Sequence, residues 1–407
     1  MITIAGAGTG SDSHLTPEVK DAINDSDVIF ASSRFQNLIP SHKTFHALTN
    51  FSQAFDLIAS MRDSRVLILV SGDPGIYSLL PLVKKRFPHE KINVLPGISS
   101  LQIICAHAGE KWNEAKILSG HGRELSPGKF LNAVERNRVT ILFCDKVISP
   151  KWACEKLAEL VGNIEVVIGE NLGSSDERIL TGRPEEFIAR EFSELSIMLI
   201  KNNNLYKPHN LRDKDFHRLD KIVMTNENVR AVILSKLGLD NEAIFWDIGA
   251  GTGSVSIEAA NFYPDCEIHA IEHKPEAAKL ISLNAAKFHV HNINIYNDRA
   301  MNLLETLPKP SHVFIGGSDG ELTGILNYLA GLENNIRVVV ACVTLENFNA
   351  AYEFMKDMKD FEVVQISVTS SKSLKPELTL MSANNPVMIL SCEMVRRRGL
   401  EPLCHRH

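Results

Sequence analysis

Short apolar runs alternate with longer amphipathic stretches through the C-terminal half of the chain. Predicted strands lie near residues 243–248, 267–271, 293–297, 312–315, 336–342 and 386–392. Residues 254–260, directly after the first of these strands, have the periodicity of a helix. Strands that alternate with helices in this way favour a mostly parallel sheet with helices on both faces.

A second alternation of the same kind occupies the N-terminal half. Its apolar runs include Ile2–Gly8, Val66–Val70 and Thr140–Phe143. Polar and charged residues interrupt the periodicity between Lys201 and Lys221, which is typical of a linker. We therefore predict two α/β domains in tandem, without an internal repeat between them. The expected boundaries are a domain at residues 1–203, a linker at 204–222, a second domain at 223–396 and a tail at 397–407.

Composition agrees with this division, because 407 residues can bury two sizeable cores. The formal net charge of -6 disfavours nucleic-acid and membrane-surface proteins but is compatible with an acidic small-molecule substrate. The seven cysteines form no Cys-x-x-Cys pair, so they indicate neither a disulfide framework nor a zinc site. No secretory leader is recognisable and no apolar run approaches the roughly twenty residues that cross a bilayer. We therefore expect a soluble, cytoplasmic protein.

The strongest local signal is a run of three glycines after the strand near residues 243–248. Gly249, Gly251 and Gly253 follow Asp247 with the spacing G-x-G-x-G, at the mouth of a helix. Glycine lets the backbone approach a ligand closely and leaves the N–H groups of a helix start free to donate. The next strand ends in Glu272, whose carboxylate could accept hydrogen bonds from both hydroxyls of a ribose. Together these features predict a nucleotide-type cofactor site.

This pair of features does not name the cofactor, because dinucleotide folds use G-x-G-x-x-G and an acid at a similar distance. The tighter spacing resembles the S-adenosylmethionine loop of Rossmann-like class I methyltransferases. The resemblance implies that the three glycines line the methionine and ribose and that Glu272 binds the ribose. It also implies four further donor-pocket residues, which are Asp298 and Ala300 at the adenine and Gly316 and Gly317 where the methyl group emerges. A solvated helix cap is an equal alternative for Asp298.

Three glycine-centred loops follow apolar strands in the N-terminal half, at residues 5–10, 71–77 and 95–100. Ligands of open α/β sheets bind at the carboxyl ends of strands, so we expect these loops to share one cleft. The first loop would commonly be taken for a dinucleotide fingerprint, but its helix is delayed until Thr16 and Pro17. A dinucleotide is therefore disfavoured.

Together these loops resemble the tetrapyrrole methylase family, the class III methyltransferases that act on uroporphyrinogen and precorrins. The motifs appear in family order, with L-T-P at residues 15–17, G-D-P-x-x-Y at 72–77 and P-G-x-S-S at 96–100. Further matches, at Gln102, Trp112 and residues 119–123 and 170–179, fit the branch that methylates carbon 5 of the ring. The resemblance implies a two-lobed α/β domain.

The same resemblance implies roles for six residues of the N-terminal half. The expected donor pocket consists of Gly72, Asp73, Ser99 and Ser100. His121 and Arg123 lie in a glycine-flanked basic loop suited to binding a propionate. A simple solvated turn is the competing interpretation of this basic loop.

The C-terminal half resembles the decarboxylating precorrin methyltransferases that act at carbon 15, with matches at residues 224–230, 246–258 and 314–318. The resemblance makes Arg230 a candidate for binding a substrate carboxylate, since a guanidinium can do so bidentately. An exposed helix cation is the alternative. Thr225 either caps the helix or contacts the acetate, and the cap is favoured. Amino-group methyltransferases carry Asp or Asn before Pro-Pro-aromatic after the fourth strand, and this motif is absent.

A fusion of the two families implies a bifunctional, S-adenosylmethionine-dependent carbon methyltransferase of corrin-ring synthesis. The implied substrate is a precorrin or cobalt-precorrin, and we expect no protein-bound metal. Enzymes that resemble either half are usually dimers or tetramers, so the resemblance implies a homo-oligomer. Three alternatives remain at this point. The N-terminal half could act on an earlier precorrin while the C-terminal half methylates something unrelated, the chain could be a tetrapyrrole-binding scaffold with one active domain, or it could be a nucleic-acid methyltransferase. The acidic charge balance disfavours the last.

Overall fold

The structure is a computed structural model that describes residues 1–61, 63–121, 125–160, 162–375 and 378–395. The chain divides into two compact units. The first unit comprises Met1–Ser126 and Ala133–Leu205, and the second comprises Pro127–Asn132 and the chain from Tyr206 onward. Apart from Pro127–Asn132, the chain passes from the first unit to the second after Leu205, near the start of the polar segment.

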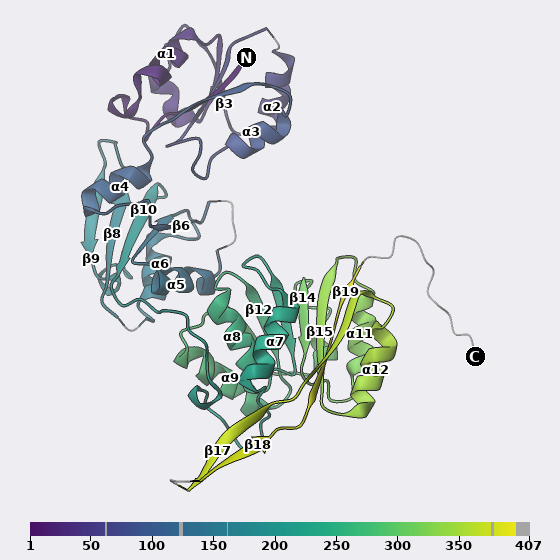
Figure 1. The fold of residues 1–407 in the computed structure, drawn as a ribbon. Helices are drawn as coiled ribbons and strands as arrows, with labels where there is room; N and C mark the ends of the chain where they lie inside the picture. Colours follow the sequence, from purple (N-terminus) through teal and green to yellow (C-terminus); the bar gives the residue numbers. More distant parts are fainter. Residues whose placement is uncertain (62, 122–124, 161, 376–377, 396–407) are drawn as a thin grey trace. The chain divides into compact units, whose positions relative to one another are not determined.

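The first unit opens with a five-stranded sheet in which all pairings are parallel (Figure 1). Its order is β3-β2-β4-β1-β5, and its strands are β1 (Ile2–Gly6), β2 (Val28–Ala31), β3 (Thr44–Ala47), β4 (Val66–Val70) and β5 (Ile92–Leu95). The connecting helices are α1 (Pro17–Asp25), α2 (Phe51–Ser60) and α3 (Leu80–Arg86), with the 3-10 helices η1 (Asp12–His14) and η2 (Ser33–Leu38). Alternate residues of β1 and β4 enter two separate apolar clusters, so both faces of the sheet are buried.

The delayed first helix is confirmed. The side chain of Thr16 accepts a hydrogen bond from the amide of Val19, and Pro17 occupies the first turn of α1. Both features are typical of a helix start. The 3-10 helix η1 fills the interval that a dinucleotide-binding helix would occupy.

A second sheet of the first unit is mixed, with the order β6-β7-β10-β8-β9, and only β6 and β7 pair in parallel. Its strands are β6 (Lys116–Ser119), β7 (Val139–Phe143), β8 (Ile164–Glu170), β9 (Arg178–Gly182) and β10 (Ser196–Asn202). Its helices are α4 (Ser100–Ala108), α6 (Pro150–Leu157), the 3-10 helix η3 (Pro184–Glu186) and the end of α5 (Pro127–Arg136), whose residues Pro127–Asn132 belong to the second unit. The expected two-lobed α/β architecture is confirmed.

The three glycine loops of the first lobe follow the adjacent strands β4, β1 and β5. The amide of Gly72 donates to the carbonyl of Gly8 at 2.7 Å. An added Cβ at Gly6 would lie 2.7 Å from the amide nitrogen of Gly97, closer than real Cβ contacts. The backbones of the three loops therefore meet, and only glycine allows this approach.

The second unit contains a seven-stranded sheet of order β13-β12-β11-β14-β15-β19-β16. Its parallel strands are β11 (Ile244–Ile248), β12 (Glu267–Ile271), β13 (Ile293–Tyr296), β14 (His312–Ile315) and β15 (Ile336–Cys342). The antiparallel strands β19 (Val387–Met394) and β16 (Lys359–Ile366) complete one edge. The predicted strands and the mostly parallel sheet are confirmed.

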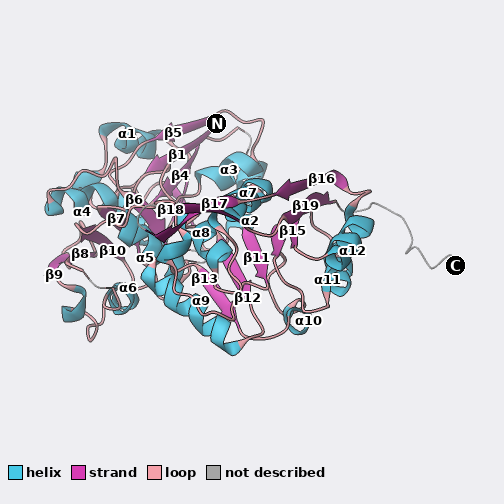
Figure 2. Ribbon diagram, turned by 60° about the horizontal axis from the view of Figure 1, so that its bottom comes forward, coloured by secondary structure: helices cyan, strands magenta, loops and turns pink. Residues whose placement is uncertain are grey.

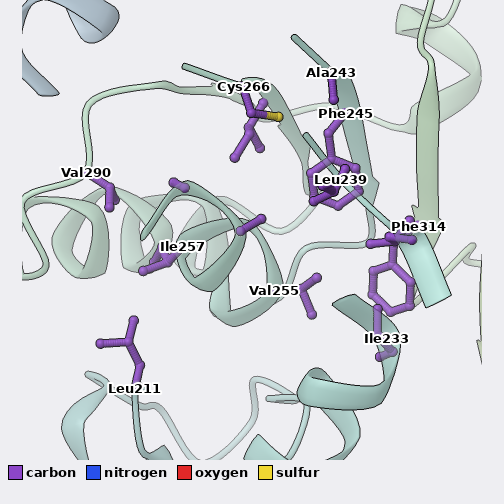
Figure 3. Close-up of a cluster of buried hydrophobic side chains, with 14 of the residues drawn as sticks. Leu211, Ile233, Leu239, Ala243, Phe245, Val255, Ile257, Cys266, Val290 and Phe314 are labelled. Atoms are coloured by element: carbon purple, nitrogen blue, oxygen red, sulfur yellow. The ribbon is translucent and has the colours of Figure 1, made fainter. Parts of the chain in front are cut away.

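Helices cover both faces of this sheet (Figure 2). One cluster of buried residues unites the strands with α7 (Glu227–Leu237), α8 (Ser254–Phe262) and α9 (Pro275–Lys287). A second cluster unites them with α10 (Ala300–Leu303), α11 (Leu322–Ala330) and α12 (Leu345–Met355). Phe245 enters the first cluster, which Figure 3 shows, and its neighbour Trp246 enters the second. Successive strand residues point to opposite faces, which explains the continuous apolar run.

Part of the expected linker belongs to the second unit. Leu211 and Phe216, on either side of the 3-10 helix η4 (Asp213–Asp215), are buried in the first of these clusters, and Leu211 is labelled in Figure 3. Two apolar side chains in an otherwise polar segment are thus enough to fasten it to the core. The predicted linker at 204–222 is wrong for this stretch.

A two-stranded sheet of β17 (Thr369–Lys375) and β18 (Leu378–Ala383) interrupts the chain between β16 and β19 (Figure 1). Most of its described side chains are exposed. The sequence pattern did not predict this hairpin, because a strand pair without a buried face has no apolar period.

Candidate active sites

The glycine loop of the second unit joins β11 to α8. Gly249, Gly251 and Gly253 have φ angles of 73°, 57° and 76°. These angles lie in the left-handed region that favours glycine. The amide of Gly249 donates to the carbonyl of Ile271 at the end of β12, at 2.9 Å. The predicted strand, loop and helix are therefore confirmed, and the loop is attached to the neighbouring strand.

Glu272 follows β12 and lies against the glycine loop. Its Oε2 accepts a hydrogen bond from the amide of Gly251 at 2.9 Å, and its Oε1 accepts one from the amide of Lys274 at 2.9 Å. The residue is buried, with 6% of its surface exposed. The two parts of the expected donor site, the glycines and the acid, are thus adjacent.

Gly316 and Gly317 follow β14, the strand on the other side of β11. The amide of Gly316 donates to the carbonyl of Ile248 at 2.9 Å, so the ends of the two strands stay together. Both glycines are exposed. They lie beside Gly249 at the carboxyl edge of the sheet.

Asp247 is buried beneath this edge, and the sequence prediction did not include it among the site residues. Its Oδ2 accepts hydrogen bonds from the amide (3.1 Å) and the hydroxyl (2.6 Å) of Ser256. Its Oδ1 has no hydrogen-bond partner among the described residues, and neither has Oγ1 of Thr252. Burial raises the pKa of Asp247 to about 6, although the Ser256 hydrogen bonds oppose the change. The sequence signal that could have identified Asp247 is a charged residue inside an apolar strand.

Asp298 and Ala300 lie at the start of α10, beyond β13. Oδ1 of Asp298 accepts hydrogen bonds from Nδ2 of Asn302 (2.8 Å) and from the amide of Arg299 (2.7 Å). The Asn302 hydrogen bond is the main reason why the pKa of Asp298 is lowered. Asp298 is exposed and Ala300 is buried. The cap of α10 is Arg299, so the alternative interpretation of Asp298 as the cap is wrong by one residue, although its carboxylate bonds to residues of the helix start. A role of Asp298 at an adenine stays a prediction.

Arg230 does not have either of its expected surroundings. It is 0% exposed and lies in the core of the second unit. Its donors are paired with Oε2 of Glu258 (2.6 Å), Oδ1 of Asp213 (2.6 Å), the carbonyl of Thr225 (2.7 Å) and the carbonyl of Leu211 (2.7 Å). The guanidinium is thus committed to protein acceptors. The predictions of a substrate ligand and of an exposed helix cation are both wrong, because the fold buries this face of α7.

Thr225 is not the cap of α7. The cap is Asn226, whose side chain accepts a hydrogen bond from the amide of Asn228 at 3.0 Å. Thr225 instead contributes its carbonyl to the guanidinium of Arg230. The favoured prediction was wrong by one residue, and a contact between Thr225 and an acetate stays a prediction.

In the first unit, Asp73 fastens the loop after β4 to the loop after β5. Its Oδ1 accepts a hydrogen bond from the amide of Gly75 at 2.7 Å, and its Oδ2 accepts one from the amide of Gly97 at 3.1 Å. The carboxylate therefore organises the backbone of the expected donor pocket. It does so through two of the predicted loops at once.

Ser99 caps α4 and lies beside Gly72. Its amide donates to Oε1 of Gln102 at 2.8 Å, and its Oγ accepts a hydrogen bond from the amide of Leu101 at 3.3 Å. This capping box explains the Gln102 match in structural terms. An added Cβ at Gly72 would lie 3.4 Å from Oγ of Ser99, so the two predicted residues are neighbours. Ser100 is the first residue of α4.

The basic loop follows β6 in the second lobe. His121 is exposed, and its amide donates to Oγ of Ser119 at 3.2 Å. Arg123 lies outside the described residues. Tyr77, from the loop after β4, reaches this lobe: its hydroxyl donates to the carbonyl of Ile117 at 2.8 Å, and its ring contacts Phe143 edge-on. Tyr77 therefore connects the expected donor loop with the second lobe.

Two family models match successive parts of the chain. The model of tetrapyrrole (corrin/porphyrin) methylases matches residues 1–188, and the precorrin methyltransferase domain matches residues 215–393. A precorrin-6Y C(5,15)-methyltransferase [decarboxylating] of Sinorhizobium sp is 28% identical over 361 residues, which are 85% of either chain. A probable cobalt-precorrin-6B C(15)-methyltransferase (decarboxylating) of Pyrobaculum calidifontis is 35% identical over 189 residues, 46% of this chain and 96% of the relative. The chain belongs to the precorrin-6Y C(5,15)-methyltransferase (decarboxylating) family.

This member of the family is therefore a methyltransferase, with both domains in one chain. A cobalt-precorrin-7 C(5)-methyltransferase of Salmonella typhimurium is 31% identical over 182 residues, 44% of this chain and 89% of the relative. The crystal structure of a precorrin-6Y C5,15-methyltransferase from Geobacter metallireducens is 37% identical, covers 46% of this chain and 97% of its own, and has a TM-score of 0.43. In the described part of this methyltransferase, no helix combines the length and hydrophobicity that a membrane span needs.

Proposed function

We propose that this chain is a bifunctional S-adenosylmethionine-dependent C-methyltransferase of cobalamin biosynthesis. It methylates carbons 5 and 15 of precorrin-6, or of its cobalt form, and removes the carboxyl group of the ring C acetate as carbon dioxide. The observation that carries the proposal is the presence of two different glycine-lined strand edges, one in each unit, within two matched methylase domains.

The residues at the carboxyl edge of the second sheet fit an S-adenosylmethionine molecule. The left-handed glycine loop brings backbone groups to the strand edge proposed for the methionine and ribose, and Glu272, beside the amide of Gly251, can accept the ribose hydroxyls. Oδ1 of Asp247 and Oγ1 of Thr252 are buried polar atoms without a partner among the described residues, and a polar ligand can supply one. When bound, S-adenosylmethionine supplies a methyl group on a sulfonium sulfur.

In the first unit, the proposed donor pocket lies on the three glycine loops. Gly72 and Ser99 form its wall, Asp73 holds two of the loops together, and Ser100 begins the adjoining helix. The helix start offers N–H groups to the donor carboxylate. The protein's task at this site is to hold the donor and the macrocycle in line.

Exposed apolar side chains support a flat acceptor in the second unit. Val223, Val343 and Leu345 have 83%, 71% and 76% of their surface exposed. The carbonyl of Val223 lies over Gly251, and Val343 follows β15, the neighbour of β14 and its two exposed glycines. A macrocycle face can cover these side chains and remove their apolar surface from water.

The chemistry of decarboxylation suits a protein that mainly positions its substrate. Cleavage of the acetate carbon–carboxyl bond leaves an electron pair that flows into the conjugated macrocycle, and a proton is then added to carbon. Because Arg230 is committed to Glu258 and Asp213, the acetate has to be held by other groups. Thr225 remains the proposed contact.

Mass analysis of the product tests the division of labour. The wild-type chain with precorrin-6 and S-adenosylmethionine should add two methyl groups and lose carbon dioxide. A Gly251→Arg variant should add one methyl group without decarboxylation, because a Cβ at this position would lie 2.6 Å from the carbonyl oxygen of Val223 and the loop would have to shift. A Gly72→Arg variant should lose the methylation of carbon 5 and keep the methylation of carbon 15 and the decarboxylation.

The outcomes separate the alternatives. A scaffold with one active domain would add at most one methyl group in the wild type, and one of the two variants would then have no effect. No change of mass in any reaction would contradict the proposal. Substrate with and without cobalt, assayed in parallel, distinguishes the two forms of the precorrin.

We also propose that the chain self-associates in the cytoplasm. The exposed apolar residues Leu378, Leu380 and Met381 of β18 support an interface on the hairpin. Light scattering of the wild type should give a multiple of 45.2 kDa. A Met381→Lys variant should shift the mass toward the monomer, and a monomeric wild type would contradict the proposal.

A further inference from the structure

A row of polar side chains crosses the second sheet of the first unit. Ser196 of β10 is the register partner of Glu170 of β8, and Glu170 is the register partner of Arg178 of β9. Residues that pair directly across neighbouring strands project from the same face of a sheet. The three side chains therefore stand next to one another at one end of the sheet.

Glu170 is the buried centre of this row. It is 0% exposed, and its Oε1 accepts hydrogen bonds from Nη2 of Arg178 (3.0 Å) and from the amide of Ser193 (2.7 Å). Its Oε2 has no hydrogen-bond partner among the described residues. A buried carboxylate is tolerated only beside a cation or strong donors, so Glu170 fixes the position of the arginine.

The guanidinium of Arg178 is bonded to Glu170 on its buried side, and the rest of the side chain is exposed to solvent. Its side chain is 53% exposed although its partner is completely buried. The guanidinium carries five donors in a rigid fork, and only one of its nitrogens is engaged by Glu170. The remaining donors can meet a planar anion bidentately.

The row lies at the end of the sheet that meets the donor loops of the first lobe. Gly173, three residues after Glu170, approaches the β1 loop so closely that an added Cβ would lie 2.9 Å from Cβ of Thr9. The ring of Tyr77, from the β4 loop, contacts Phe143, whose register partner Ile197 is the neighbour of Ser196. A tetrapyrrole held at this donor site would bring its side chains toward this edge.

We propose that Arg178 binds a carboxylate side chain of the tetrapyrrole during methylation in the first unit, and that Glu170 is the positioning residue that aims its guanidinium. This inference rests on the proposed function. The acetate and propionate groups of a precorrin are planar anions of the kind that arginine recognises. The pair therefore selects a polycarboxylate macrocycle and orients it toward the donor.

The experiment uses the full chain and compares its two reactions. Arg178→Lys keeps the charge beside Glu170 but removes the fork, and Glu170→Gln with Arg178→Met removes both charges together. The matched control is Arg65→Met, which breaks the ion pair of Arg65 with Asp27, in which both side chains are exposed. Each variant is assayed for the KM of tetrapyrrole and of S-adenosylmethionine in C5 and in C15 methylation.

Arg178→Lys should raise the tetrapyrrole KM of C5 methylation about tenfold, the effect of losing one charge-assisted hydrogen bond. The double variant should raise it at least as much. In these variants the KM of S-adenosylmethionine in C5 methylation should stay unchanged. The KM values of tetrapyrrole and of S-adenosylmethionine in C15 methylation should also stay unchanged. Arg65→Met should change no KM in either reaction. Unchanged tetrapyrrole KM values in C5 methylation, or equal rises in both reactions, would overturn the inference. A wild type that does not methylate carbon 5 would instead contradict the proposed function.

Discussion

Gly249 and Gly317 meet backbone to backbone at the carboxyl edge of the second sheet, and the contact is asymmetric. A Cβ added to Gly249 would lie 2.6 Å from the amide nitrogen of Gly317. A Cβ added to Gly317 would have Cα of Gly249 at 3.9 Å as its nearest neighbour. The strand end after β11 therefore requires glycine, whereas the strand end after β14 has room for a methyl group.

This asymmetry predicts opposite outcomes for two alanine variants. Gly249→Ala adds both the clash and a left-handed φ of 73°, and should lower the free energy of unfolding by about 2 kcal/mol. It should also reduce the binding of S-adenosylhomocysteine from two molecules per chain to one. Gly317→Ala should keep both molecules. Isothermal titration calorimetry measures the stoichiometry, and a Gly249→Ala variant that binds two molecules would contradict the assigned donor site.

The position of Glu272 predicts the loss of one donor site without loss of the fold. Glu272→Gln replaces a carboxylate that could accept both ribose hydroxyls, and should weaken S-adenosylhomocysteine binding in the second unit about ten- to a hundredfold. The control is Glu276→Gln, an exposed residue in the first turn of α9. Calorimetry should resolve one weakened site and one unchanged site. Two unchanged sites would exclude Glu272 from the donor pocket.

Because the guanidinium of Arg230 is buried and paired, we expect its substitution to lower the stability of the protein and not to change the KM of the tetrapyrrole. Arg230→Met leaves Glu258 and Asp213 without their cation, and should lower the free energy of unfolding by about 3–5 kcal/mol. Urea unfolding checks this directly. A variant of normal stability with a raised tetrapyrrole KM would restore the substrate-binding role that the sequence suggested.

The raised pKa of Asp247 predicts how stability depends on pH. The folded protein holds this proton more tightly than the unfolded chain, so the stabilisation is complete below about pH 4 and is lost as the pH rises through about 6. The change of pKa from 3.8 to about 6 corresponds to about 3 kcal/mol. In thermal unfolding without added donor, Asp247→Asn should therefore remove a decline in stability between pH 4 and pH 7. If stability depends on pH in the same way in the wild type and in Asp247→Asn, the protonation of Asp247 does not cause the decline.

The exposed side chain of Val343, after β15, predicts a defect in tetrapyrrole binding that is confined to C15 methylation. Val343→Glu places a charge on the proposed acceptor surface, and should raise the tetrapyrrole KM of C15 methylation about tenfold or more. Donor binding and C5 methylation should not change. The matched control is Leu283→Glu, an exposed apolar residue of α9. Equal effects of the two variants would show that Val343 has no special role.

Much of the fold and part of the site followed from local pattern. The strands of the second sheet are buried on both faces, so each reads as an apolar run with sharp ends. The glycine loops were recognisable because left-handed turns and close backbone approach restrict the residue type, as at Gly249 and Gly6. Glu272 could be predicted from the sequence, because one helix and one strand set the number of residues between it and the glycine loop.

Other features had no local signal. Leu211 and Phe216 lie in a polar segment that resembles a linker, yet the second core buries them. Arg230 looked like a substrate ligand because a lone arginine in a helix does not reveal its surroundings. Its acceptors, at Leu211, Asp213, Thr225 and Glu258, are supplied by other parts of the chain.

The sequence by itself determined the two α/β domains, the positions of the glycine loops and the acid that accompanies one of them. These depend on residue types that backbone conformation and burial restrict locally. Only the tertiary structure decided which polar groups are already paired and which are open. It buried Arg230, left Oδ1 of Asp247 without a partner among the described residues, and held Arg178 beside a buried carboxylate. Desolvation and hydrogen bonding are properties of the environment that distant segments create, so a one-dimensional pattern cannot specify them.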